Sequence, residues 1–373
     1  MPSKVLYVAT VVKKHIMQFH IPFLKMCGDA GWETAVAARN DYADADACSI
    51  PFCDTYYDIP FERSPLKGKN ITAYRELKKV IESGSYDIIH CHTPVGAMLT
   101  RLAARGARKK GTQVIYTAHG FHFYKGAPLL NWIVYYPAER FLARWTDVLI
   151  TINKEDYARA QKFSAGKVVY MPGVGIDLAR FSAPITEEQK HRLRAEIGVP
   201  DDAVLICSVG ELNANKNHSL VIRALAQMEN KNIHYCVIGE GEYREPLTVL
   251  ARELGLTEQV HLPGYRSDVP ALLKSSDIFC FPSLREGLPV ALMEAMASGL
   301  PCVASRIRGN TDLLDETNEA LFDPHSVSEC RNRLAAAISE NKVLPETKYA
   351  SVLSLFSKES VLAQMKEIYG IIE

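Results

Sequence analysis

The segment 277–308 constrains the fold more than any other part of this chain, because it holds a complete strand–loop–helix–strand unit. The apolar run 278–281 predicts a buried strand. Glu286 then opens a helical pattern. The apolar residues of that pattern share one helical face: Leu288, Ala291, Leu292, Ala295 and Met296. Gly299 ends the helix before a second strand-like run at 302–304. A strand, a helix and a strand at this spacing are typical of a parallel sheet covered by helices.

The same alternation recurs along the whole chain. Further strand-like runs lie at 4–9, 34–38, 88–92, 114–118, 147–152, 168–172, 203–209, 233–238 and 260–263. A length of 373 residues is enough for two domains. We therefore predict an α/β protein with two Rossmann-like, doubly wound domains and a cleft between them. Ligands of such sheets bind beyond the carboxyl ends of the strands.

Composition excludes some classes of protein. The formal net charge is zero, so nothing indicates a general nucleic-acid binder. Nine cysteines without a CxxC pair indicate a reducing compartment. No signal peptide or membrane-spanning run is evident, which predicts a cytoplasmic protein. The five basic residues within 101–110 are read as a solvated helix end. The alternative is a patch facing anionic lipid at the inner membrane face.

Two carboxylates in the segment 277–308 suggest a binding site. Glu286 and Glu294 are eight residues apart, which on a continuous helix is about 12 Å along the axis and about 80° around it. The helix start with Arg285 would suit a phosphate. The two carboxylates would accept hydrogen bonds from sugar and ribose hydroxyls. The simpler alternative is that Glu286 is a first-turn helix charge and Glu294 a solvated one.

The sequence Glu286-Gly-Leu-Pro with Glu294 resembles the Glu-x7-Glu signature of retaining family-four glycosyltransferases, which have the two-Rossmann-domain GT-B fold. The resemblance extends over nearly the whole chain. The segments His119-Gly-Phe-His-Phe-Tyr and Gly210-Glu-Leu-Asn resemble the bacterial enzymes of capsular and exopolysaccharide synthesis. The family resemblance implies an acceptor-binding domain of residues 1–172 plus 355–373, with a returning C-terminal helix. Residues 173–354 would form the nucleotide-sugar domain.

The resemblance also implies residue roles. His119 and Glu286 would contact the transferred sugar, as the catalytic pair. The donor-binding residues would be Gly210, Lys216, Tyr265, Arg266, Arg285, Gly287, Leu288, Pro289 and Glu294. This chain departs from the family in two places: Glu211 stands where many members have an arginine, and a Gly-Gly loop is missing. A phosphate or acceptor loop would instead use Lys13, Lys14, His15, Arg306 and Arg308.

The implied reaction moves a sugar, a hexose or N-acetylhexosamine, from a UDP-sugar to a hydroxyl of a lipid-linked or saccharide acceptor. The resemblance implies anomeric retention, no cofactor and no metal, with Lys216, Arg285 and the helix at Gly287 neutralising the leaving diphosphate. A metal site of His90, His92, His119 and His122 is disfavoured, because such sites usually include carboxylate or thiolate ligands.

Three alternatives to a transferase remain at this stage. A nucleotide-sugar 2-epimerase of related fold would release a C2 epimer from the donor alone. An inactive transferase-like assembly subunit would bind the donor without turnover, and Glu211 gives this alternative some weight. A nicotinamide oxidoreductase is disfavoured, because no Gly-x-Gly-x-x-Gly follows the first strand.

Overall fold

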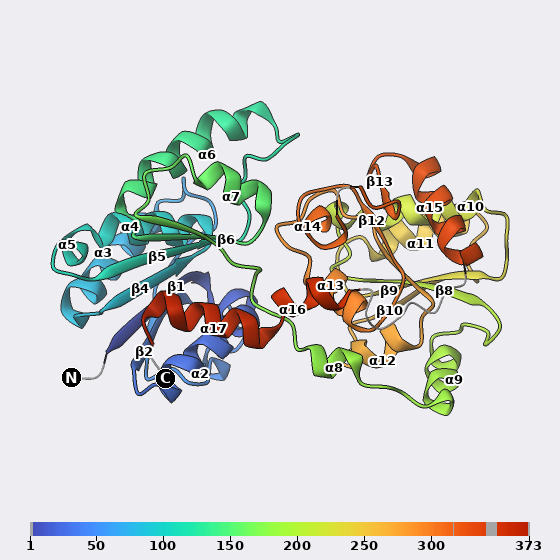
Figure 1. Ribbon diagram of the computed structural model, residues 1–373, viewed down its shortest axis with the longest axis horizontal. Helices are drawn as coiled ribbons and strands as arrows, with labels where there is room; N and C mark the ends of the chain where they lie inside the picture. Colours follow the sequence, from blue (N-terminus) through green and yellow to red (C-terminus); the bar gives the residue numbers. More distant parts are fainter. Residues whose placement is uncertain (1–2, 316, 341–348, 372–373) are drawn as a thin grey trace. The chain divides into compact units, whose positions relative to one another are not determined.

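The computed structural model describes residues 3–315, 317–340 and 349–371. It divides into two compact units, shown in Figure 1. Unit 1 comprises Met1–Gly175 with Glu359–Glu373, and unit 2 comprises Ile176–Lys358. Each unit is a parallel sheet with helices on its faces, which confirms the predicted pair of Rossmann-like α/β domains.

The sheet of unit 1 has seven strands in the order β3-β2-β1-β4-β5-β6-β7, all paired in parallel. The strands are β1 (Lys4–Val11), β2 (Glu33–Arg39), β3 (Thr55–Asp58), β4 (Ile88–His92), β5 (Gln113–Ala118), β6 (Val148–Thr151) and β7 (Lys167–Tyr170). Alternate residues of β1 enter two different cores: Leu6 and Val8 pack on one face and Val5 and Tyr7 on the other. Both faces of the sheet are therefore buried.

Helices cover both faces of this sheet. They are η1 (Val12–Ile16), α1 (Met17–Phe19), α2 (Ile21–Asp29), η2 (Ala45–Ala47), α3 (Lys69–Gly84), α4 (Pro94–Ala103), α5 (Arg105–Arg108), α6 (Leu129–Leu142), η3 (Ala143–Trp145), α7 (Lys154–Ala160) and α17 (Lys358–Tyr369). The last of these, α17, buries Val361, Met365 and Tyr369 in the same core as Val5 and Tyr7.

Unit 2 has a six-stranded parallel sheet in the order β10-β9-β8-β11-β12-β13. Its strands are β8 (Val204–Val209), β9 (Ile233–Ile238), β10 (Val260–Gly264), β11 (Ile278–Phe281), β12 (Cys302–Ser305) and β13 (Leu321–Phe322). Its helices are α8 (Leu178–Ser182), α9 (Glu187–Glu196), η4 (Ala214–Lys216), α10 (His218–Ala226), α11 (Arg244–Glu253), α12 (Val269–Lys274), α13 (Val290–Ala297), α14 (Asn310–Leu314), α15 (Val327–Glu340) and α16 (Ala350–Leu355).

Strand order reverses at one point in each sheet. In unit 1 the reversal lies between β1 and β4, and in unit 2 between β8 and β11. Connections leave neighbouring strands in opposite directions there, so a crevice opens beyond their carboxyl ends, and ligands of doubly wound sheets bind at such switch points. A ligand site is therefore expected at each of the two switch points.

The structure differs locally from the predicted runs and loops. The residues after β1, predicted as a loop, form the helical turn η1, and the backbone N–H of Met17 donates to the carbonyl of Val12. No strand was predicted within 40–70, yet β3 pairs with β2 there. The chain is interrupted before the returning C-terminal helix at Ser357, which bridges to Ile176, so α16 and α17 are separate helices. Residues 372 and 373 of the predicted segment 355–373 lie outside the described residues.

The basic segment 101–110 is not a solvated helix end throughout. The side chain of Arg101 is 1% exposed and pairs with Glu139 at 2.9 Å, with its guanidinium 4.2 Å from the ring centre of Tyr116. Arg108 pairs with Asp147 at 2.8 Å. Arg101 is therefore a buried structural residue of unit 1 and is not available to a ligand at the surface. Within the described residues, no helix has the length and apolarity needed to cross a bilayer.

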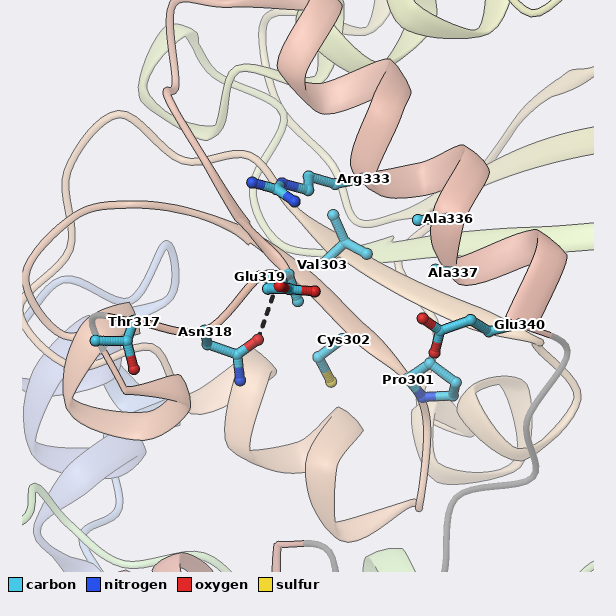
Figure 2. A pocket seen from close by; sticks show the side chains of 11 residues that line it. Pro301, Cys302, Val303, Thr317, Asn318, Glu319, Arg333, Ala336, Ala337 and Glu340 are labelled. Atoms are coloured by element: carbon cyan, nitrogen blue, oxygen red, sulfur yellow. Dashed lines mark hydrogen bonds between the residues drawn. The ribbon is translucent and has the colours of Figure 1, made fainter.

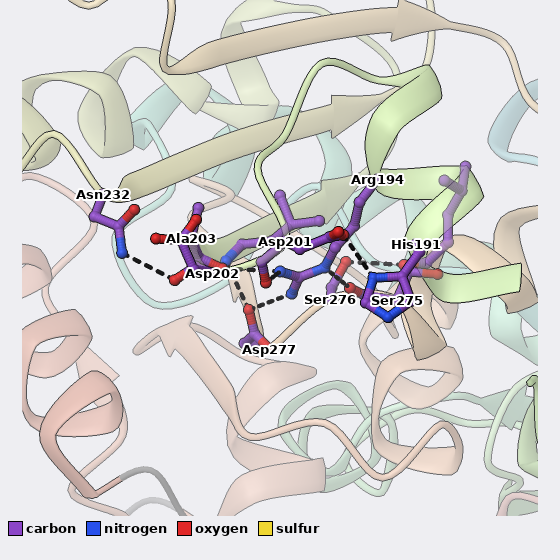
Figure 3. A network of polar contacts seen from close by, with 11 residues as sticks. His191, Arg194, Asp201, Asp202, Ala203, Asn232, Ser275, Ser276 and Asp277 are labelled. Carbon is purple, nitrogen blue, oxygen red and sulfur yellow. Dashed lines mark hydrogen bonds and ion pairs between the residues drawn. The ribbon is translucent and has the colours of Figure 1, made fainter. Parts of the chain in front are cut away.

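A buried arginine organises the amino ends of β8 and β11 in unit 2 (Figure 3). Arg194 is 2% exposed. It donates to the Asp277 carboxylate at 2.6 Å and to the carbonyls of Ser275, Asp201 and Ala203 at 2.9 to 3.0 Å. Asp277 also accepts from the backbone N–H of β8 at 2.7 Å. This network satisfies the backbone groups at the amino edge of the sheet.

Candidate functional site

The switch point of unit 2 brings Lys216 and Glu286 together. Lys216 ends η4, which follows β8, and Glu286 lies in the loop after β11. The Lys216 ammonium is 2.8 Å from a carboxylate oxygen of Glu286, and the two side chains are 20% and 15% exposed. The ammonium also lies 4.9 Å from the ring centre of Phe281. A predicted donor-binding residue, Lys216, and a predicted catalytic residue, Glu286, thus form a half-buried ion pair across 70 positions of sequence.

Polar side chains from two segments, 215–217 and the turn at Arg308, hold the loop that carries Glu286. The amide of Asn215 donates to the carbonyl of Arg285 at 2.9 Å. The amide of Asn217 donates to the carbonyl of Pro282 at 3.2 Å. The Arg308 guanidinium donates to the backbone carbonyl of Glu286 at 3.0 Å. Arg308 therefore positions the backbone of the loop, while the carboxylate of Glu286 pairs with Lys216.

Glycines permit close approach of the loops around this pair. A Cβ at Gly239, after β9, would lie 1.9 Å from the carbonyl oxygen of Gly210, and a Cβ at Gly241 would lie 2.2 Å from that of Leu212. A Cβ at Gly309 would lie 2.7 Å from the carbonyl oxygen of Gly287. No role was predicted from the sequence for Gly239, Gly241 or Gly309. The Gly-x-Gly that follows β9 was the available signal for the first two.

The predicted helix start at Glu286 and Gly287 is wrong. Helix α13 begins at Val290, and Pro289 precedes it in an extended conformation, with φ −84° and ψ 102°. A residue before proline is disfavoured in the α region, so Leu288 cannot continue a helix into Pro289. Glu286, Gly287 and Leu288 therefore lie in the loop. The helical spacing expected between Glu286 and Glu294 does not apply.

Glu294 lies one turn inside α13 and is half-buried. Burial raises the pKa of its carboxyl to about 7, and the nearby Arg180 on α8 acts in the opposite direction. It is thus not a solvated helix charge. A carboxyl with a pKa near neutrality titrates in the physiological range, and such groups are frequent in functional sites.

The remaining predicted donor-site residues of unit 2 differ in their surroundings. Tyr265 is 76% exposed. Arg266 is engaged by the Asp268 carboxylate at 2.6 Å and by Glu196. Arg285 is exposed, and Arg306 donates to a β13 carbonyl at 3.3 Å. No described contact joins Tyr265 or Arg266 to the pair of Lys216 and Glu286.

The switch point of unit 1 carries a cluster of histidines. His119 follows β5, His92 ends β4, and His15 lies on η1 after β1. His119 Nε2 is 3.3 Å from His92 Nδ1, and the rings of His15 and His119 are 4.9 Å apart in an edge-on arrangement. Burial lowers the pKa of His119 to about 4 and lowers that of His15 well below its usual value. Both imidazoles are therefore neutral at pH 7.

Lys13 and Lys14 differ from His15 in exposure. Both lysine side chains are exposed, while their backbone N–H groups donate to the Asp41 carboxylate at 2.5 and 3.3 Å. The predicted phosphate loop thus has two solvent-facing cations and one ring turned toward the histidine cluster. Arg306 and Arg308, predicted with them, belong to unit 2.

The four histidines that were considered and disfavoured as a metal site from sequence are not the four that the fold brings together. His90 is engaged on both ring nitrogens, by Tyr369 at 2.6 Å and by Thr117 at 2.7 Å. His122 stacks on Tyr135 at 4.7 Å. The described residues that could hold a metal are instead His15, His20, His92 and His119. His20 was missed, because its place beside the others comes from the packing of η1 and α1 and has no counterpart in sequence spacing.

Two cavities lie near different edges of the sheets. One in unit 1, about 490 Å³, is lined by His15, Lys14, Arg63 and residues of α4 and α6. One in unit 2, about 440 Å³, lies at the amino end of β12, between Pro301, Cys302 and α15 (Figure 2). The second contains none of the predicted site residues and lies at the edge opposite to ligand sites in doubly wound sheets.

Comparison with known proteins gives consistent matches. A family model described as "Glycosyl transferases group 1" matches residues 189–351, and one described as "Glycosyl transferase 4-like" matches residues 4–153. The chain is 41% identical over 318 residues to the putative glycosyltransferase EpsD of Bacillus subtilis, covering 84% of this chain and 81% of that protein.

A second relative has a fuller description. Identity is 30% over 296 residues, covering 75% of each chain, with the UDP-Gal:alpha-D-GlcNAc-diphosphoundecaprenol alpha-1,3-galactosyltransferase of Escherichia coli. Among solved structures, Anabaena Alr3699/HepE in complex with UDP and glucose has a TM-score of 0.78 at 18% identity, covering 99% of this chain and 100% of that chain. This likeness establishes the fold.

Proposed function

The chain belongs to the group 1 glycosyltransferases and has the GT-B fold, and we propose that it moves a hexose or N-acetylhexosamine from a UDP-sugar to an acceptor hydroxyl. The transfer would retain the anomeric configuration. The acceptor would be a lipid-linked or saccharide intermediate of surface polysaccharide synthesis. The glycosyltransferase class follows from the family. The donor, the stereochemistry and the acceptor are the proposal.

The observation that carries the proposal is the half-buried pair of Lys216 and Glu286 at the switch point of unit 2. A nucleoside diphosphate sugar has a dianionic diphosphate next to a ring with vicinal hydroxyls. An ammonium and a carboxylate 2.8 Å apart provide a partner for each part. Both side chains are already largely desolvated, so their contacts with a ligand would be stronger than in bulk water.

In the proposed complex, Lys216 exchanges Glu286 for the diphosphate. The carboxylate of Glu286 then accepts hydrogen bonds from hydroxyls of the transferred sugar, and Glu294 accepts from the ribose. The negative charge that develops on the leaving diphosphate would be stabilised by Lys216 and by Arg285. The acceptor hydroxyl would attack on the face that the diphosphate leaves, so no protein nucleophile is required. We propose that no metal ion takes part at this donor site.

The relative from Escherichia coli supports the choice of donor and acceptor. Its name gives UDP-Gal as donor and a diphosphoundecaprenol-linked sugar as acceptor. A diphosphate on a polyprenyl chain needs cations and an apolar surface. In unit 1, the exposed residues Lys14 and Arg63 line the 490 Å³ cavity, and the exposed Lys13 precedes Lys14 in the chain. His119 at the carboxyl end of β5 is the residue that we assign to the transferred sugar.

Helix α6 supports peripheral contact with the inner membrane face. The large apolar side chains exposed along this helix are Leu129, Leu130, Ile133, Val134 and Phe141, between 47% and 73% exposed. Val134 also lines the cavity of unit 1. Exposed apolar clusters of this kind mark interaction surfaces. We expect Ile133→Ser to weaken sedimentation with anionic vesicles, and Ile71→Ser, an exposed apolar change on α3, to leave it unchanged.

The test of the proposal is product analysis. The protein is incubated with UDP-Gal, UDP-Glc, UDP-GlcNAc or UDP-GalNAc and a short-chain polyprenyl diphosphate sugar as acceptor. We expect release of UDP and a product whose new linkage is α by proton NMR coupling. A β linkage would overturn retention. No transfer with any donor, while UDP binds, would favour the assembly subunit, and a C2 epimer formed without acceptor would favour the epimerase.

A further inference from the structure

Four histidine rings meet at the switch point of unit 1 and come from separate parts of the sequence. His15 lies on η1, His20 precedes α2, His92 ends β4 and His119 follows β5. One ring nitrogen from each can be chosen so that all four lie within 4.8 Å of one another. The switch-point position gives the cluster access from the ligand-binding edge of the sheet.

The cluster is short of hydrogen-bond partners. Both ring nitrogens of His20, together with Nε2 of His15 and of His92, have none, although His20 and His92 are each 1% exposed. A buried polar atom without a partner destabilises a fold, so each such atom needs an explanation. His90 shows the contrast. It packs 4.2 Å from His92, yet hydroxyl groups engage both of its ring nitrogens.

The spacing of the rings suits a shared ion. Four imidazoles around an ion at bonds of about 2.0 to 2.1 Å place neighbouring nitrogens about 3.3 Å apart and ring centres about 5 Å apart. His119 Nε2 and His92 Nδ1 are 3.3 Å apart. Centre-to-centre distances run from 4.9 to 5.9 Å for five of the six ring pairs. The sixth pair, His20 and His92, stacks at 3.8 Å and must open to bind.

The protonation state of the rings also fits. Burial lowers the pKa of His20 and His92 well below the usual value and that of His119 to about 4. Only the neutral imidazole binds a metal, so these rings lose no proton on binding at pH 7. Neutral imidazoles, with four ring nitrogens that lack a hydrogen-bond partner, are a ligand set in the form that binds a metal.

We propose that unit 1 binds a divalent transition-metal ion through His15, His20, His92 and His119. The set contains nitrogen ligands alone, which favours Zn²⁺, Co²⁺, Ni²⁺ or Cu²⁺ over Mg²⁺ and Ca²⁺, since the latter select oxygen. The ligands carry no charge, so the ion keeps its double positive charge. An anionic fifth ligand is expected from the side of His15, whose ring lines the 490 Å³ cavity.

This inference is independent of the proposed donor site, because its ligands all belong to unit 1 and Lys216, Glu286 and Glu294 belong to unit 2. It bears on His119, which would hold the ion through one nitrogen and keep only the other for a substrate. UDP binding, measured on the same samples, reports on unit 2 separately.

The test uses untagged full-length protein, freed of metal with a chelator and titrated with Co²⁺. We expect visible absorption bands of a tetrahedral nitrogen-ligated Co²⁺ ion, saturating at about one ion per chain, and displacement of Co²⁺ by Zn²⁺. Mass spectrometry of the elements in protein purified without chelator should show a bound transition metal. Phosphate should change the Co²⁺ spectrum if the ion takes an anionic fifth ligand.

Matched variants assign the ligands. His20→Gln and His119→Gln should each lower the Co²⁺ affinity at least about tenfold, because even outer-sphere partners of metal ligands contribute that much. His90→Gln removes a histidine from the same core without removing a ligand and should keep the affinity. If His20→Gln does not fold, His15→Gln and His119→Gln decide, since their rings are less buried. No visible Co²⁺ bands in the wild type, or an equal loss in His90→Gln, would overturn the proposal.

Discussion

The switch points of the two sheets share a topology and differ in chemistry. In unit 2 the edge carries an ion pair, Lys216 with Glu286, and a carboxyl of raised pKa, Glu294. In unit 1 the same edge carries neutral imidazoles, several without a hydrogen-bond partner. Doubly wound topology therefore fixes where a ligand binds, and the residues after the strands decide which ligand it is.

The largest effect is expected at the ion pair. Glu286→Gln keeps the shape of the side chain and removes the charge, and we expect kcat/KM for transfer to fall about 100- to 1,000-fold, as for loss of one transition-state partner. The matched control is Glu319→Gln, which lines the cavity at the amino edge of unit 2 (Figure 2) and should retain wild-type activity. A Glu286→Gln variant with nearly full activity would contradict the role of this edge.

A buried arginine at the amino edge should affect stability without affecting the donor site. Arg194→Met leaves the Asp277 carboxylate and three carbonyls without their donor, and we expect about 3 kcal/mol of local destabilisation. All three tryptophans lie in unit 1, so tryptophan fluorescence cannot follow this change. Hydrogen exchange of β8 and β11 peptides should accelerate, while the affinity for UDP stays the same. Unchanged exchange would show that the network is dispensable.

A glycine pair tests the close approach of loops in unit 2. Gly239→Ala would place Cβ 1.9 Å from the carbonyl oxygen of Gly210, whereas Gly255→Ala meets no atom within 4 Å and has only its positive φ of 70° as strain. We expect about 1 kcal/mol of destabilisation for Gly255→Ala and at least twice as much for Gly239→Ala, with weaker UDP binding in the latter alone. Calorimetric titration with UDP separates the two variants.

The smallest effect is expected at Glu294, and it has a defined pH dependence. Its folded-state pKa of about 7 lies above the unfolded value. The folded state therefore holds the proton more tightly, and this stabilisation is lost as pH rises from about 4.5 to about 7. Glu294→Gln lacks this titration. The free energy of unfolding of the variant minus that of wild type should therefore rise by about 1 to 2 kcal/mol between pH 4.5 and pH 8. It should also bind UDP more weakly at pH 8. A pH-independent difference would show that the carboxyl has an ordinary pKa.

Much of the fold could be predicted from sequence, because most strands of the two sheets are short apolar runs followed by a polar break. The run 278–281 became β11 and the run 302–304 became β12, which extends to Ser305. The edge strand β3 was missed, since Thr55 to Asp58 is polar and half-exposed, so its apolar period is weak. The start of α13 was misplaced, because helical period continued through Leu288 while Pro289 imposed an extended conformation.

The site could be predicted only where one motif carried it. Glu286 and Glu294 stood out together, and Lys216 followed from the same resemblance. The partners that hold the loop, Asn215 and Asn217, have no signature of their own, since an amide that bonds a backbone carbonyl 65 or 70 residues away leaves no local pattern. His20 was missed because the packing of η1 and α1, and no sequence spacing, places it beside the other histidines.

The most direct test of the central claim, that the carboxyl edge of unit 2 binds the nucleotide sugar, is hydrogen exchange of the full-length protein with and without saturating UDP. Backbone amides are slowed where a ligand orders the chain. The account predicts protection in peptides covering 210–217 and 282–294, and none in peptides covering 301–303 and 317–320 at the opposite edge. Bound UDP without protection in 210–217 and 282–294 would contradict it.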